Sequence, residues 1–241
     1  VDVARSRWWR ATLWLSLGVA VKPLAIVLVL LIMVIYRPMT WRMLLGTAAI
    51  ALMPFVAQHP AYVLQQYAAF LHSTTKAVHV GVVVQGWSSP FSALRLVGVD
   101  LPEHVQTALR LVAALATLVL CVLARRRHDA VHSAIFVFSL AVAYLMLFSP
   151  RTENNTYAML GPAIAVFLAE AFFVEKRSPG EGILLGSIAV ALLGSRLLER
   201  LLTPHAGTSW VSPLMAVCFA GYLLVRLFAD PEKPSAGKGA A

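Results

Sequence analysis

Charged side chains are scarce in this chain, and acidic ones are scarcer still. Asp, Glu, Lys and Arg make up 13% of the 241 residues, against about 25% in an average soluble domain. Hydrophobic residues make up 59%, and the mean hydropathy is +0.77. This composition excludes an ordinary soluble domain and is typical of a polytopic membrane protein.

The chain has 20 Lys and Arg residues but 11 Asp and Glu residues, which gives a formal net charge of +9. Such an excess can signal nucleic-acid binding, but here the bases sit in short clusters between long apolar runs. That placement is the one that positive-inside anchoring predicts. The expected partners are therefore membrane lipids, and no nucleic acid.

Cysteine and the familiar catalytic motifs are also lacking. The two cysteines, Cys121 and Cys218, each lie inside an apolar run and read as packing residues. The chain has no phosphate-binding glycine loop, no HExxH and no nucleophile elbow. No metal and no cofactor are expected. The chain also begins without Met or a signal peptide, so we expect further residues upstream.

What the chain does have is apolar length. A membrane-spanning helix needs about 20 mainly apolar residues, so we predict an all-α polytopic fold with about seven transmembrane segments. A membrane domain is expected over residues 1–229 and a disordered cytoplasmic tail over 230–241. The apolar runs are Ala11–Tyr36, Met43–Ala57, Val105–Ala124, Val131–Phe148, Tyr157–Val174, Ile183–Leu198 and Trp210–Ala229.

Basic clusters set the expected orientation. If all of them lie in the cytoplasm, the segments 58–104, 149–156 and 199–209 lie outside. Segment 58–104 is too polar to span and too apolar to be a linker. It therefore predicts helices lying in the outer membrane interface.

The first run has basic residues at both of its ends and a Lys22–Pro23 pair near its middle. Proline disfavours helix at the residue before it and removes a backbone hydrogen bond. Two readings stay open: a hairpin of two half-helices that turns at Lys22, or one kinked span with a snorkelling lysine. In both readings an ionisable residue at that depth is a functional candidate.

Three features are expected on the outer face: Lys22, the block "VVVQGWSSPFSALRL", and the loop "SPRTENNTY". Together they offer cations, amides, hydroxyls and aromatic faces, which is what a lipid-linked phosphosugar requires. The predicted donor-phosphate ligands are Lys22, Arg95 and Arg151. The predicted sugar or headgroup contacts are His79, Gln85, Trp87, Ser88, Glu153, Asn154, Asn155 and Tyr157.

Plainer interpretations stand beside these. Arg151 and Glu153 can be a solvated surface pair, and Trp87 an interfacial belt residue. His79 can be an ordinary interfacial histidine.

Three blocks, in order, resemble the bacterial glycosyltransferases of family 87. They are "SLGVAVKPLAIVLVLLIMVIYRPMTWRMLL", "QGWSSPFSALRLVG" and "SPRTENNTYAMLGPAI". The resemblance implies a GT-C membrane fold and a hexosyltransferase, with mannose the typical sugar. It also implies a polyprenyl-phosphate-linked sugar donor, a lipid or glycan acceptor, and an active site on the outer face of the cytoplasmic inner membrane.

Two departures from the family pattern matter. Family members commonly carry adjacent histidines in the Ser-Pro loop, where this chain has Asn155 and Thr156. The resemblance implies that the carboxylate acting as the catalytic base lies in a first outer loop, upstream of Val1. The acidic residues expected in the outer segments are not where the family places it: Asp100, Glu103, Glu153 and Glu199. The catalytic residue is therefore unknown. Two alternatives stay open: a transporter or flippase for a lipid-linked or anionic substrate, favoured by the broken first helix, or an inactive partner subunit.

Overall fold

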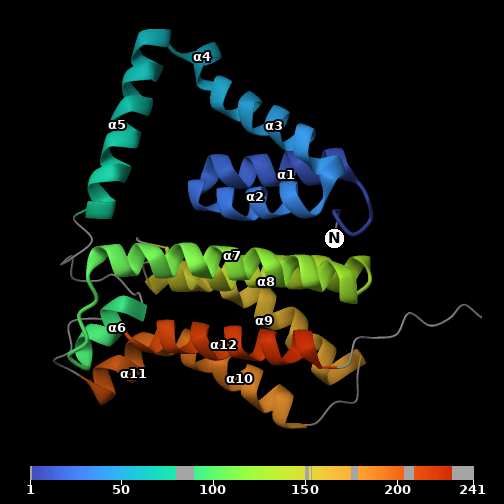
Figure 1. Ribbon diagram of the computed structural model, residues 1–241, viewed down its shortest axis with the longest axis vertical. Coiled ribbons are helices and arrows are strands. Elements are labelled where there is room, and N and C mark those ends of the chain that lie inside the picture. The colour runs from blue at the N-terminus through green and yellow to red at the C-terminus, as the bar shows by residue number, and fades with distance from the viewer. Residues whose placement is uncertain are drawn as a thin grey trace, which may run out of the picture. The chain divides into compact units, whose positions relative to one another are not determined.

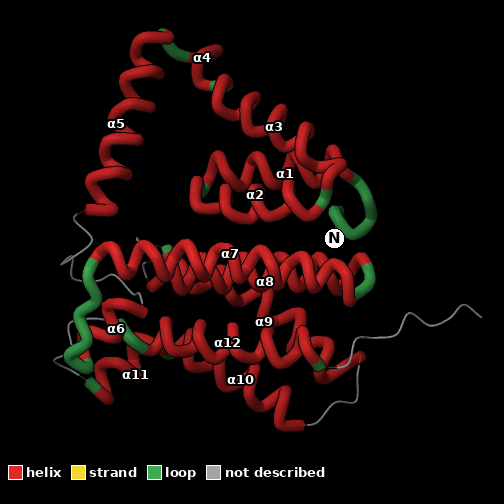
Figure 2. The backbone as a smooth tube through the Cα atoms, in the orientation of Figure 1, coloured by secondary structure: helices red, strands yellow, loops and turns green. Residues whose placement is uncertain are grey.

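The computed structural model describes residues 2–79, 90–149, 152, 154–174, 179–203 and 209–229, and all regular structure in this part of the chain is helical (Figures 1 and 2). The predicted all-α fold is confirmed. The chain divides into two compact units, Val1–Gln85 and Gly86–Ala241, called unit 1 and unit 2 below. The predicted tail 230–241 lies outside the described residues.

Unit 1 consists of a helical hairpin, a longer helix and a separate helical arm. The hairpin is formed by the first three elements, and the longer helix continues through a short proline-initiated turn before the arm begins (Figure 1). The elements are α1 (Trp8–Val21), the 3₁₀ turn η1 (Pro23–Ala25), α2 (Ile26–Ile35), α3 (Arg37–Leu52), α4 (Pro54–Ala57) and α5 (Pro60–His79).

The break at Lys22 turns the first apolar run back on itself. Lys22 has an extended backbone (φ −138°, ψ 99°), and Pro23 starts the next helical turn. The rings of Trp8 and Tyr36, at the two ends of the run, lie 6.3 Å apart. A continuous helix would separate these residues by about 42 Å. The hairpin reading is therefore confirmed, and the reading as one kinked span is wrong.

Small side chains let α1 and α3 approach closely. Thr12 and Ser16 on α1 are buried, and they face Gly46 on α3. A Cβ atom built on Gly46 would lie 2.8 Å from Cγ2 of Thr12 and would also collide with the Ser16 hydroxyl. Such close backbone packing through Gly, Ser and Thr is the usual way in which helices associate in lipid.

Unit 2 is built around α8, the most deeply buried of its candidate spans. Figure 1 shows α7 lying along α8, with α9, α10 and α12 completing the bundle. The elements are α6 (Pro90–Leu96), α7 (Glu103–Arg127), α8 (Ala130–Phe148), η2 (Asn154–Met159), α9 (Leu160–Ala169), the π turn η3 (Glu170–Val174), α10 (Pro179–Leu193), α11 (Ser195–Leu202) and α12 (Val211–Phe228).

An aromatic cluster forms the core of unit 2. The ring of Phe167 on α9 lies 5.5 Å from that of Phe136 on α8, and 6.3 Å and 5.6 Å from Phe219 and Tyr222 on α12. Tilted and edge-on ring pairs at these distances are favourable beyond the area they bury. The cluster ties three helices together.

Helices long and apolar enough to cross a membrane account for most of the predicted spans. Among the described residues there are five, or six if the α10–α11 pair counts as one span bent by 77°. The first predicted run is the hairpin instead. Neither α5 nor α6, from the segment predicted to be interfacial, meets the criterion for a span.

Candidate functional site

Lys22 occupies the tip of the unit 1 hairpin. Its N–H donates to the carbonyl of Gly18, and its own carbonyl accepts from the N–H of Ala25 at 2.9 Å. The side chain is half-buried, about 21 Å along α1 from Trp8. The sequence thus places a cation on a non-helical residue at the far end of two apolar helices.

The base of the hairpin gathers aromatic and basic side chains. The guanidinium of Arg42 lies over the rings of Trp41 and Trp9, at 4.5 Å and 5.5 Å from their centroids, and the two rings pack edge to face at 5.2 Å. Because Trp8 and Tyr36 also meet here, both basic ends of the first run share one end of unit 1. The hairpin thereby removes the conflict that a single span would create with the positive-inside rule.

In unit 2, one end of the bundle is rich in buried hydroxyl groups. This end, called the polar end below, is formed by α6, the start of α7, the end of α8, η2 and the start of α12. Small hydroxyls are rarely this deeply buried without a packing or binding reason. The buried hydroxyl residues are Ser149, Thr152, Thr156, Ser209 and Ser212.

Tyr157 fastens η2 to α8 at the polar end. Its ring is buried, and its hydroxyl donates to the carbonyl of Met146 at 3.1 Å. The neighbouring Asn155 is exposed, and its Oδ1 accepts from the Thr156 hydroxyl at 3.5 Å. Of these predicted site residues, Asn155 is therefore accessible to a ligand, while Tyr157 positions the turn that carries it.

Arg95, a predicted phosphate ligand, forms an ion pair in the segment that joins α6 to α7. Its Nε lies 2.8 Å from Oδ1 of Asp100, whose side chain is well exposed. Exposed pairs of this kind contribute about 0–1 kcal/mol. The pair offsets part of the Arg95 charge, yet an anionic ligand could displace Asp100 at small cost.

Arg110 is a residue that the sequence reasoning did not single out. It lies on α7 inside an apolar run, with its guanidinium 5.3 Å from the centroid of the Phe91 ring. Its Nη2 is 3.5 Å from Oε1 of Gln106, and its Nε is buried without a hydrogen-bond partner among the described residues. The available signal was the presence of an arginine within a spanning segment.

Glu199 links α11 to the start of α12 at the polar end. Its Oε1 accepts from the Ser209 hydroxyl and from the N–H groups of Trp210 and Val211, at 2.5, 2.9 and 3.0 Å. A carboxylate there satisfies otherwise unbonded N–H groups and complements the helix dipole. Glu199 thus serves as the cap of α12.

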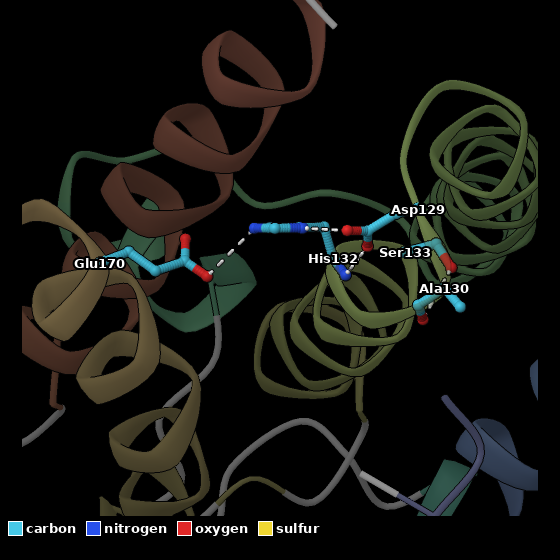
Figure 3. A network of polar contacts seen from close by, with 5 residues as sticks. All are labelled: Asp129, Ala130, His132, Ser133 and Glu170. Carbon is cyan, nitrogen blue, oxygen red and sulfur yellow. Dashed lines mark hydrogen bonds and ion pairs between the residues drawn. The ribbon is translucent and has the colours of Figure 1, made fainter. Parts of the chain in front are cut away.

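The opposite end of unit 2 carries a separate polar network (Figure 3). Nδ1 of His132 lies 3.0 Å from Oδ2 of Asp129, and Nε2 lies 3.8 Å from Oε1 of Glu170. Glu170 begins the π turn that ends the span containing α9. Nearby in the chain, Arg125, Arg126 and Arg127 end α7, so this is the basic end of the bundle.

Several predicted site residues lie outside the described residues: Gln85, Trp87, Ser88, Arg151 and Glu153. His79 closes α5 and Asn154 opens η2, but only their backbones are described. The structure brings Asn155 and Tyr157 together in η2 of unit 2. Lys22 belongs to unit 1 and Arg95 to unit 2. All of these binding roles remain predictions.

Comparison with known proteins gives one match. The family model of glycosyltransferase family 87 matches residues 1–150, which is more than half of the chain. The matched part contains the Lys22 hairpin and runs to the end of α8. No curated protein and no solved structure matches the chain.

Proposed function

The chain belongs to glycosyltransferase family 87, and we propose on this premise that it moves a hexose, mannose in the first instance, from a polyprenyl-phosphate donor to a lipid or glycan acceptor. Membership and the apolar helices make it a multi-pass membrane glycosyltransferase. The proposed location is a bacterial cytoplasmic membrane, with the reaction on its outer face.

The proposed reaction is a displacement at the anomeric carbon of the sugar. An acceptor hydroxyl oxygen forms the new bond, and the bond between that carbon and the donor phosphate oxygen breaks. The polyprenyl phosphate leaves with the electron pair, and the acceptor proton passes to a carboxylate base of the protein. Cations held around the leaving phosphate stabilise the charge that develops on it.

The observation that carries the proposal is the hairpin with Lys22 at its tip. Irregular backbone at membrane depth is tolerated where it is buried in protein or lines a polar cavity. A lysine there supplies a compact positive charge for a phosphate, whereas Arg151 would supply a planar, bidentate donor. Lys22 lies in the part of the chain that matches the family.

The remaining predicted contacts divide by their surroundings. Asn155 is exposed on η2 and suits a sugar or phosphate oxygen, with Tyr157 holding the turn in place. Arg95 would join the phosphate site by exchanging Asp100 for the ligand. The sequence-based contacts of His79, Gln85, Trp87, Ser88, Glu153 and Asn154 complete the proposed headgroup site.

A transfer assay tests the proposal. Membranes containing the full-length protein are supplied with a polyprenyl-phosphate sugar, and sugar transfer is followed for the wild type, Lys22→Ala and Lys22→Arg. Loss of a charged hydrogen-bond donor costs about 1.5–3 kcal/mol, so we expect Lys22→Ala to slow transfer about 10- to 100-fold. Lys22→Arg should recover part of the rate.

Arg10→Gln provides the matched control, because it removes an exposed charge from the same helix. Its transfer rate should equal that of the wild type. Undiminished transfer by Lys22→Ala would remove Lys22 from the mechanism. Transfer from a nucleotide sugar, with none from the polyprenyl-phosphate sugar, would overturn the proposed donor class.

A further inference from the structure

We propose that Arg110 and Ser149 form a binding site for the phosphate of a long-chain lipid at the polar end of unit 2. The inference rests on the proposed function and adds a phosphate-binding cation to it. The site also includes the amide of Gln106 and an aromatic wall of Phe91, Tyr144 and Phe148. Four observations lead to it.

The first observation is the unused hydrogen-bonding capacity of Arg110. Nε is buried and has no hydrogen-bond partner among the described residues, and within the same part of the chain the guanidinium makes one hydrogen bond, the 3.5 Å approach of Nη2 to Oε1 of Gln106. A good N–H···O bond measures 2.7–3.2 Å, so this contact is weak. A guanidinium has five N–H donors in a fixed plane. Most of them are available to a ligand.

The second observation is charge. Arg110 forms no ion pair within the part of the chain that the structure describes. At this end of the unit, Asp100 is paired with Arg95, and Glu199 caps α12. Glu103 begins α7 two turns before Arg110. The Glu103 carboxylate attracts the Arg110 charge from a distance, but the two are not among the ion pairs of the described residues. A positive charge within a spanning helix and without a closely paired carboxylate favours an anionic ligand.

The third observation is Ser149, the residue that directly follows the end of α8. The residue is 6% exposed, and its Oγ has no hydrogen-bond partner among the described residues. A buried hydroxyl without a partner costs free energy that a ligand oxygen would recover. Ser149 is the first residue of the loop "SPRTENNTY", which is predicted to bind the headgroup.

The packing of α7 against α8 places Arg110, Gln106 and Ser149 near the same end of the bundle. The two helices run antiparallel, and the Tyr144 hydroxyl donates to the carbonyl of Arg110 at 3.4 Å. Ser149 lies about 7.5 Å beyond Tyr144 along α8, and Gln106 lies about 6 Å before Arg110 along α7. Because the two helices are antiparallel, both displacements point toward the same end of the bundle. Helical side chains tilt toward the helix N-terminus, so the Arg110 side chain extends toward that end.

The fourth observation is the aromatic wall, which favours a lipid as the ligand. The Phe148 ring lies 6.4 Å from Phe91 and 5.5 Å from Tyr144, and Arg110 lies over Phe91. An apolar aromatic surface next to a guanidinium suits a phosphate ester with a hydrocarbon chain. Two sources share this chemistry: the polyprenyl phosphate of the reaction and the anionic phospholipids of the bilayer.

Binding of undecaprenyl phosphate, the product-side lipid, tests the site independently of transfer. The full-length protein is placed in nanodiscs of zwitterionic lipid, and retention of undecaprenyl phosphate is titrated by native mass spectrometry. We expect about 10- to 100-fold weaker binding for Arg110→Gln and up to about tenfold weaker binding for Ser149→Ala. Arg110→Lys keeps the charge and should fall between the wild type and Arg110→Gln.

Arg126→Gln is the matched control, because Arg126 is exposed at the other end of the same helix. It should bind like the wild type. Equal binding by wild type and Arg110→Gln, or equal weakening by Arg126→Gln, overturns the site. If Arg110→Gln does not fold, Ser149→Ala and Arg110→Lys decide: binding by both at wild-type strength also overturns it.

Two further arms separate this inference from the proposed function. Competition by phosphatidylglycerol at equal concentration should leave undecaprenyl phosphate bound; full displacement would assign the site to bulk anionic lipid and overturn the inference. A wild type that retains undecaprenyl phosphate through Arg110 but transfers no sugar would overturn the proposed function and support the site. A wild type that retains none overturns the site even if it transfers sugar.

Discussion

Asp129 holds the first turn of α8 through both of its carboxylate oxygens. Oδ1 accepts from the N–H of His132 at 2.7 Å, and Oδ2 lies 3.0 Å from the ring of the same residue. Burial by itself raises the pKa of Asp129, but the hydrogen bonds and positive charge that His132 offers outweigh it and leave the pKa below its ordinary value. The carboxylate is thus bonded in its charged form.

The pH dependence of stability follows from the sign of that shift. Because the folded-state pKa is lowered, the contribution of Asp129 is fully present above the ordinary pKa of about 3.9. It is lost as the pH falls through the lowered folded-state value. We expect Asp129→Ala to lower the free energy of unfolding by about 0.5–2 kcal/mol at pH 7, as loss of an N-cap does.

Thermal unfolding in detergent, followed by circular dichroism, measures this effect. The difference in Tm between wild type and Asp129→Ala should narrow as the pH falls from 7 toward about 3. Asp129→Asn keeps an oxygen that can accept from the His132 N–H but lacks the negative charge, so its Tm at pH 7 should lie between those of the wild type and Asp129→Ala. A difference that stays constant over this range would show that the charge of Asp129 contributes nothing.

The burial and the neighbours of individual side chains were the hardest features to predict from the sequence. Tyr157 was predicted as an accessible aromatic face, and the sequence could not show that its ring turns toward Met146 on α8. Arg110 was overlooked because its neighbours Phe91 and Tyr144 come from segments distant in sequence. Asn155 was predicted from its polar loop and is exposed, whereas Thr152 and Thr156 of the same loop are buried, a difference that the run of polar residues does not predict.

At the scale of elements, the contact between α1 and α3 depends on Gly46. Helical Gly→Ala changes normally stabilise by about 0.5–1 kcal/mol through backbone entropy. At Gly46, however, the new methyl group meets Thr12 and Ser16, and overpacking costs about 1–3 kcal/mol. We therefore expect Gly46→Ala to lower the Tm.

Gly18→Ala is the matched control on α1, because a Cβ atom there meets nothing within 4 Å. It should leave the Tm unchanged or raise it. The comparison is made by thermal unfolding of both variants in the same detergent. A Gly46→Ala variant as stable as Gly18→Ala would mean that the two helices do not rely on this close approach.

Helices were predictable where length and hydropathy alone decide the outcome. The runs that became α7, α8, α9 and α12 were recognised because each holds enough apolar residues to span a bilayer. The run over 183–198 was predicted as one span, but it bends by 77° near Gly194. An apolar run that contains glycine is compatible with a straight or a bent helix, and in the structure the second half of the bent pair carries Glu199, which caps α12.

At the scale of the whole molecule, the proposed orientation can be tested by chemical labelling. Single cysteines replace exposed residues in a Cys121→Ser, Cys218→Ser background, and intact spheroplasts are treated with a membrane-impermeant maleimide. We expect Gln58→Cys and Asp100→Cys to label at once. Arg37→Cys and Arg126→Cys should label after permeabilisation, because the basic clusters are predicted to be cytoplasmic.

Arg10→Cys adds a control for the hairpin, because it precedes the Lys22 turn and Arg37 follows it. The two positions should label under the same conditions. Labelling of Arg10→Cys and Arg37→Cys from opposite sides would contradict a hairpin in the membrane, and outside labelling of Arg126→Cys would reverse the orientation of unit 2.

The fold class and the family could both be recognised from the sequence, since each depends on patterns that run along the chain. The division into two units could not, because it depends on which helices contact one another. The Lys22–Pro23 pair left two readings open, and it was the meeting of Trp8 with Tyr36 that decided between them.

The closed base of that hairpin has a consequence for how the chain is inserted. A segment that enters and leaves a bilayer on the same side does not change the side of the membrane on which the following residues begin. Excising residues 8–36 would therefore leave every later helix with its original polarity, although the lysine at the tip would be gone. If Lys22 binds the donor phosphate as proposed, orientation and substrate binding are encoded in separable stretches of the chain.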